Sequence, residues 1–186
     1  MEQPTIIEKA LEFAKKDADT SHMISSILRE WICSTYKYSD ENVEDVLGKF
    51  FEEQNYPQDK ADFVISIVTN VGFSKQLAGL TSPIFPELAV VSDADRLDAI
   101  GAFGVARTFS YGASRPLYDP DYPIRTELTK EEYCKATKEP TINHFYEKLL
   151  KLLDMMYIDT GKEMAKSRHE FMESFVEQMH AEFKCV

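Results

Sequence analysis

The chain has 186 residues and a formal net charge of −11 at pH 7, with 44% hydrophobic and 12% aromatic residues. This length and composition fit one globular domain with a real core, and they exclude an intrinsically disordered chain. The negative charge makes duplex nucleic acid and membrane surfaces poor partners, because both repel an acidic protein. A small anionic ligand would need a local group of basic residues or a metal ion.

The cysteines and the first residues of the chain indicate a cytoplasmic protein. Cys33, Cys134 and Cys185 have no paired spacing, so neither a disulfide framework nor a thiolate metal site is predicted. The opening MEQPTIIEKALEFAKK lacks the basic and then apolar pattern of a signal peptide. The longest uncharged stretch, 63–74, is well short of the ~20 residues that span a bilayer.

Apolar residues at helical spacing predict four helices in the first part of the chain. Pro4 fits the first turn of a helix that ends near Lys16, and a second helix is predicted over 22–34. A third is predicted over 42–54 and ends at Asn55-Tyr56-Pro57. Residues 58–71 alternate like a strand, but their length and the acidic start after Pro57 favour a helix.

The second part of the chain is also predicted to be helical. Pro86 fits the first turn of a central helix that continues to Phe109. The capping-box pattern from Thr129 to Glu132 predicts a short helix through Lys138. A long helix to about Tyr157 and a last helix over 162–183 are expected to pack as an antiparallel pair.

The stretch between the central helix and the capping box is expected to be an ordered loop over 110–128. It has three prolines and no periodicity, and it carries too few charges for a solvated linker. Arg115 and Arg125 lie in this loop. They are candidates for binding an anion, although ion pairs are the commoner use of an arginine in so acidic a chain.

Three carboxylates surround Arg96 in the segment VSDADRLDAIGAFGVARTF, at Asp93, Asp95 and Asp98. In a continuous helix, Asp95 would share a stripe with Ala99, Ala102 and Ala106, which we expect to be buried against a neighbour. A buried carboxylate must be paired, hydrogen-bonded or bound to a metal, so Asp95 is a candidate metal ligand. Alternatively, the acids and Arg96 form an ordinary charge cluster near a helix N-terminus.

The stretch VSDADRLDAIGAFGVARTFSYG resembles the signature of one branch of the HD-domain metal-dependent phosphohydrolases. INHFYEKLLKL and SRHEFME are similar to the C-terminal helices of that branch, and the resemblance extends from about Ala10 to Glu182. It implies an all-helical bundle that holds a divalent metal ion (Mn, Co, Fe, Zn or Mg) and hydrolyses a phosphate ester or a nucleotide. The resemblance makes Asp95 a metal ligand, with Arg96 and Asp98 in support.

The remaining ligands that this family uses are replaced or absent. The family has a histidine on an early helix, where this chain has Ser26, and an adjacent His-Asp pair on a later helix. The four histidines here are His22, His144, His169 and His180, and none precedes an aspartate. In the family, a whole helix with the His-Asp pair lies between the positions of Arg29 and Tyr36. In this chain only a short connecting segment lies between them. We interpret 32–39 as a seam where an internal segment is missing.

The prediction is therefore an all-α, HD-domain-like bundle, shortened by the loss of an internal helical segment. It forms a single domain over 1–186, with a remnant of the metal-site bundle over 1–109, the ordered loop, and C-terminal helices over 129–186. The loss of a helix would expose apolar surface and favour reduced stability or self-association. Candidates for that surface are Phe50, Phe51, Phe63, Ile65 and Ile67.

Two functions remain open. The first is metal-dependent hydrolysis, with the metal at Asp95 and His22 and the substrate phosphate near Arg29 and His144. The second is a catalytically inactive form, a splice product or a pseudoenzyme, that binds a nucleotide or a protein partner. The missing ligands favour the second.

Overall fold

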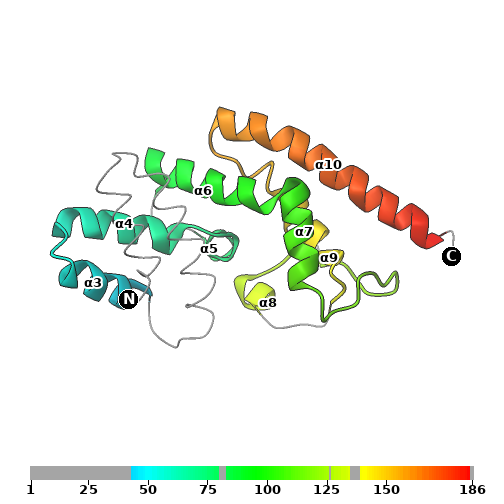
Figure 1. Cartoon of the computed structure of the whole chain (residues 1–186), viewed down its shortest axis with the longest axis horizontal. Coiled ribbons are helices and arrows are strands. Elements are labelled where there is room, and N and C mark those ends of the chain that lie inside the picture. The colour runs from blue at the N-terminus through cyan, green and yellow to red at the C-terminus, as the bar shows by residue number, and fades with distance from the viewer. Residues whose placement is uncertain (1–42, 80–82, 126, 135–138, 185–186) are drawn as a thin grey trace, which may run out of the picture. The chain divides into compact units, whose positions relative to one another are not determined.

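The structure is a computed structural model that describes residues 43–79, 83–125, 127–134 and 139–184 (Figure 1). The described residues fall into two compact units, one with 43–71 and 83–91, the other with 72–79 and the residues from 92 onwards. Every element in them is a helix, so the predicted all-α class is confirmed. The two helices expected before residue 35, the seam, His22 and Arg29 lie outside the described residues.

The first unit contains the third and fourth helices predicted from the sequence. Helix α3 (Val43–Glu53) and helix α4 (Gln58–Asn70) have nearly the expected bounds. Val71 is in an extended conformation and ends α4. The two helices pack through apolar side chains at Val43, Leu47, Phe51, Ala61, Val64 and Val68.

The apolar set that we expected to be exposed in this region is divided. Phe51 and Ile67 are buried, the latter in a cluster with Leu88 and Val91. Phe63 has 42% of its surface exposed even though its ring packs against Phe85 at 5.5 Å between centroids. Self-association of the chain stays a prediction.

The second unit supplies most of the core and all of the site described below. It contains α5 (Phe73–Leu77), the second half of α6 (Pro86–Ala99), α7 (Gly101–Tyr111), α8 (Lys130–Cys134), α9 (Asn143–Glu147), the 3₁₀ helix η3 (Leu149–Lys151) and α10 (Asp159–Lys184). Its core is a cluster around Ile100, Phe145, Leu149, Leu152 and Met172. The long helix α10 crosses α7 (Figure 1), and α5 packs on α8.

The prediction of one continuous central helix is wrong. Ile100 is extended, with φ −113° and ψ 170°, and Gly101 has φ 77°, so the chain turns between α6 and α7. The turn needs small residues, because a Cβ at Gly104 would lie 2.2 Å from the carbonyl oxygen of Ala99. The expected buried stripe is consequently absent: Asp95, Ala102 and Ala106 are exposed.

The prediction of a long helix that follows Thr141 and continues to about Tyr157 is also wrong. Lys148 interrupts it with φ −137° and ψ −62°, and the chain continues with bonds that span three residues, from Lys151 N–H to Lys148 and from Leu152 N–H to Leu149. A 3₁₀ turn places Leu149 and Leu152 on one side, and both are buried. Helix α10 therefore packs on α7 and η3 instead of forming an antiparallel pair with a long neighbour.

The capping box predicted at the start of α8 is confirmed. The Thr129 hydroxyl accepts a bond from the Glu132 N–H at 3.2 Å, and the Glu132 carboxylate accepts one from the Thr129 N–H at 2.9 Å. The chain before α8 is attached to the segment before α9, where Thr141 N–H donates to the Pro116 carbonyl at 2.8 Å. In the part of the chain that the structure describes, none of the helices combines the length and apolarity that crossing a membrane requires.

Candidate functional site

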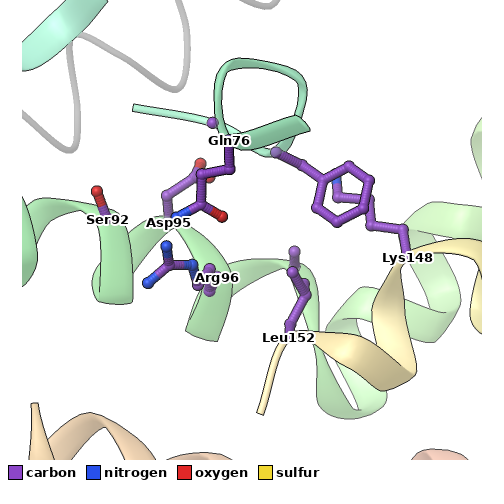
Figure 2. Close-up of a pocket in the computed structure, with 9 residues that line it drawn as sticks. Gln76, Ser92, Asp95, Arg96, Lys148 and Leu152 are labelled. Atoms are coloured by element: carbon purple, nitrogen blue, oxygen red, sulfur yellow. The ribbon is translucent and has the colours of Figure 1, made fainter. Parts of the chain in front are cut away.

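A pocket in the second unit is lined by residues from three separate stretches of chain. Figure 2 shows Ser92, Asp95 and Arg96 from α6, Gln76 from α5, and Lys148 and Leu152 from the segment that follows α9. Phe73 adds an aromatic wall. The pocket thus combines one carboxylate, two cationic groups, an amide and apolar surface.

The carboxylate of Asp93 is buried, and both of its oxygens accept hydrogen bonds within the protein. Its carboxylate accepts a hydrogen bond from Arg96 at 2.6 Å and bonds from the backbone N–H groups of Tyr157 and Ile158 at 2.9 Å. These bonds leave it no geometry for a metal ion. The acid nearest in sequence to the predicted ligand therefore holds the start of α10.

Arg96, predicted to support a metal ion, is buried between Asp93 and an aromatic ring. Its guanidinium carbon lies 4.3 Å from the centroid of the Tyr157 ring. The charge of Asp93 offsets that of Arg96, so Arg96 contributes shape to the pocket more than net positive charge. Its role at a metal site stays a prediction.

Asp98 and Asp95 make different contacts. The Asp98 carboxylate lies 2.6 Å from the Arg107 guanidinium and links the end of α6 to α7 across the turn at Gly101. Asp95 lines the pocket and is exposed. Of the three acids that crowd together in the sequence, only Asp95 faces the place where a ligand would lie.

The described histidines are engaged elsewhere. Both ring nitrogens of His180 are bonded, Nδ1 to the Tyr118 hydroxyl at 2.7 Å and Nε2 to the Tyr146 hydroxyl at 2.6 Å. His169 on α10 lies 3.3 Å from Glu173. Burial, together with the positive charges of Lys148 and Arg115, lowers the pKa of His144 to about 4. His144 is therefore neutral at pH 7 and a poor partner for a phosphate.

The donors in the described residues do not fit a divalent metal ion of the kind that the resemblance implies. Across 43–79, 83–125, 127–134 and 139–184, no three His, Cys, Asp or Glu side chains lie together in a way that could hold one. A borderline metal is normally anchored by imidazole, and His22, outside the described residues, is the remaining histidine of the chain. No metal-dependent step follows from this donor set.

Lys148 lies at the break between α9 and η3, and its side chain lines the pocket. Its ammonium lies 5.7 Å from the centroid of the Phe73 ring and 5.9 Å from that of Tyr133, within the range of a cation–π contact. In the described part of the chain, Lys148 forms no ion pair with a carboxylate. In the pocket of an acidic protein, a lysine that forms no such ion pair is a natural contact for an anion.

The arginines of the loop before α8 form ion pairs, as is usual in an acidic chain. Arg125 binds Glu147 through two parallel bonds of 2.9 and 2.7 Å, and its pKa is raised above its ordinary value, first by that hydrogen bond. Arg115 lies 3.7 Å from Glu139. Glu147 is buried and no sequence signal marked it, because its partner is 22 residues away.

Comparisons with known proteins identify relatives over nearly the whole chain. No family model matches the sequence. The uncharacterised protein YpgQ of Bacillus subtilis is 32% identical over 161 residues, which are 87% of this chain and 69% of YpgQ.

Solved structures agree with this relationship. A protein of Lactobacillus plantarum matches with a TM-score of 0.73 and 32% identity, over 95% of this chain and 82% of its own. An HD-superfamily hydrolase of Bacillus thuringiensis matches with a TM-score of 0.60 and 30% identity, over 97% and 84%. YpgQ in complex with ADP matches with a TM-score of 0.61 and 29% identity, over 95% and 85%.

Proposed function

The chain belongs to the HD superfamily, in the family of Bacillus subtilis YpgQ, and from this premise we propose that it binds a nucleotide without hydrolysing it. The nucleotide lies in the pocket between α5, α6 and the segment after α9, with a phosphate group at Lys148. Support for the ligand class comes from the relative YpgQ, which has been crystallised with ADP.

The observation that carries the proposal is the state of Lys148. Its ammonium lies over two aromatic rings, and it forms no ion pair with a carboxylate of the described residues. The neighbouring His144 has a pKa of about 4 and is uncharged at neutral pH. A phosphate oxygen at Lys148 would complete a charge-assisted hydrogen bond, the stronger class of such bonds.

The proposed loss of hydrolysis follows from the ligand inventory. The superfamily's chemistry needs imidazoles and carboxylates around an ion that activates water. By the family resemblance, Ser26 stands where the first histidine ligand is expected, and the sequence contains no His-Asp pair. Asp93 and Asp98 are held by Arg96 and Arg107, so they do not replace the missing ligands around Asp95.

Calorimetric titration of the full chain with ADP tests the binding half of the proposal. We expect Lys148→Met to weaken ADP binding about 10- to 100-fold, the range for a hydrogen bond to a charged group. Lys162→Met, which removes an exposed lysine of α10 outside the pocket, is the matched control and should leave the affinity unchanged. Absence of ADP binding, or equal affinities in the two variants, would contradict the proposal.

Equilibrium dialysis against Mn²⁺ tests the other half. The protein should retain less than one tightly bound ion per chain, and Asp95→Asn should retain the same amount as the unmodified chain. An ion bound stoichiometrically in the unmodified chain and lost in Asp95→Asn would show that other donors complete the site.

A further inference from the structure

Asp93 occupies a junction between three parts of the second unit. Asp93 has 1% of its surface exposed, and its carboxylate accepts a hydrogen bond from the guanidinium of Arg96 on the same helix. It also accepts the N–H groups of Tyr157, at 2.9 and 3.0 Å to its two oxygens, and of Ile158, at 2.9 Å. Backbone amides just before a helix are otherwise without partners, so Asp93 caps α10 from another helix.

The packing around Asp93 leaves little freedom for the start of α10. Gly161, in the first turn of that helix, lies so close that a Cβ on it would be 2.6 Å from Oδ2 of Asp93. The Ile158 carbonyl accepts the Lys162 N–H at 3.0 Å, the first bond of the helix. The carboxylate and the first turn of α10 are therefore fitted to each other at hydrogen-bond and van der Waals distance.

Two pocket side chains depend on the same junction. Arg96 lies between Asp93 and the Tyr157 ring, 4.3 Å from its centroid. The hydroxyl of Tyr157 accepts a bond of 2.5 Å from the Gln76 side-chain amide on α5. Arg96 and Gln76 both line the pocket (Figure 2). Asp93 thus touches one pocket residue directly and fixes the backbone of the residue that holds the other.

We propose that Asp93 is the positioning residue of the pocket: it sets Arg96 directly and Gln76 through Tyr157, and it ties both to the start of α10. The effect on ligand binding rests on the proposed function, whereas the positioning of the two side chains does not. Asp93 itself does not line the pocket.

Nuclear magnetic resonance of Asp93→Asn tests the positioning without any ligand. Asparagine keeps the size of the side chain but removes its charge and one acceptor oxygen. We expect the Arg96 Nε–H and the Gln76 side-chain NH₂ resonances to shift or broaden, and the Tyr157 and Ile158 amides to exchange at least about 10-fold faster. The comparator is Met172→Ala, a buried change in α10 that is outside the pocket lining.

Met172→Ala should lower the melting temperature by several degrees while leaving the Gln76 and Arg96 side-chain resonances in place. Unchanged resonances of both residues in folded Asp93→Asn would overturn the proposal. If Asp93→Asn does not fold, Tyr157→Phe replaces it, because this change removes only the hydroxyl that holds Gln76. In that variant the Gln76 resonance must move, and a Gln76 resonance that stays fixed would equally overturn the proposal.

ADP titration of the same variants separates this proposal from the proposed function. We expect Asp93→Asn or Tyr157→Phe to weaken ADP binding at least about 10-fold, and Met172→Ala to change it less than about twofold. Failure of the unmodified chain to bind ADP would contradict the proposed function alone. Displaced Arg96 and Gln76 resonances with unchanged ADP affinity would overturn the inferred importance of Asp93 for the ligand.

Discussion

Two ion pairs in the same stretch of sequence have the same length and very different surroundings. Arg96 and Asp93 are 2.6 Å apart with 6% and 2% of their side chains exposed, while Arg107 and Asp98 are 2.6 Å apart with 53% and 23% exposed. The first pair also receives two backbone amides and an aromatic ring. The comparison shows that the distance between charges does not rank ion pairs, because the cost of breaking one depends on how much water can replace the lost partner.

The largest effect is expected from Arg96→Met. Removal of the guanidinium leaves the Asp93 carboxylate buried with only its two backbone donors, and breaking such a pair typically costs about 3–5 kcal/mol. Urea unfolding should therefore show a drop of at least about 3 kcal/mol in the free energy of unfolding. A loss below about 1 kcal/mol would place this pair in the same class as the exposed one.

The second largest effect is expected from His144, through the pH dependence of the free energy of unfolding. The pKa of His144 is about 4 in the folded chain, below its usual 6.5, so the unfolded state binds a proton first as the pH falls. The free energy of unfolding therefore falls between pH 6.5 and about 4, by an amount on the order of 2–3 kcal/mol.

The variant His144→Gln isolates this contribution from that of the acids. The difference in unfolding free energy between the unmodified chain and His144→Gln should shrink or reverse as the pH is lowered from 7 to 4. Parallel stability curves for the two proteins across this range would show that His144 keeps an ordinary pKa.

A third prediction concerns the turn that separates α6 from α7. Gly101 has φ 77°, and a Cβ there would lie 3.0 Å from the Arg168 side chain, so Gly101→Ala should cost about 1–2 kcal/mol. Gly48→Ala is the matched control, because Gly48 lies within α3 and has nothing within 4 Å of an added Cβ. Thermal melting should show Gly48→Ala to be stabilising by up to about 1 kcal/mol. Equal effects of the two changes would contradict the turn.

The smallest effect is expected from Arg107→Met. The Arg107–Asp98 pair is open to water, and exposed pairs contribute about 0–1 kcal/mol. The loss should shrink further in high salt, which screens exposed charges, and a salt series of urea unfolding measures it. A loss as large as that of Arg96→Met would erase the distinction on which the comparison rests.

The sequence predicted those parts of the fold that depend on local chemistry. Apolar spacing located α3 and α4, Pro86 marked the start of α6, and the Thr129 to Glu132 pattern marked the start of α8. Each of these signals acts within one or two helical turns. The resemblance to HD-domain proteins is confirmed at the level of the superfamily by the match to an HD-superfamily hydrolase.

The errors arose where distant residues decide the local structure. The turn at Gly101 was missed because the run of Ala and Gly was interpreted as part of one continuous helix with small side chains. Gly101 and Gly104 together allow the chain to turn there. The interruption at Lys148 has no local signal, since the sequence around it has helical periodicity and only the buried Leu149 and Leu152 select the 3₁₀ turn. The role of Asp93 could not be predicted because its carboxylate binds the backbone N–H of Tyr157, 64 residues away.

The same reason explains the uneven outcome at the site. Residue types and family resemblance indicated that Asp95 would face a ligand, and it lines the pocket. They did not indicate Gln76 or Phe73, which reach the pocket from other elements. The metal ligand role of Asp95 and His22 and the phosphate role of Arg29 stay predictions.

The most direct test of the account is the release of phosphate or pyrophosphate from nucleotides by the purified full chain in the presence of Mn²⁺. We expect no release above that of Asp95→Asn, because the sequence contains no His-Asp pair and the described residues hold no group of three side chains that could bind a metal ion. Mn²⁺-dependent release that is present in the unmodified chain and abolished in Asp95→Asn would contradict it.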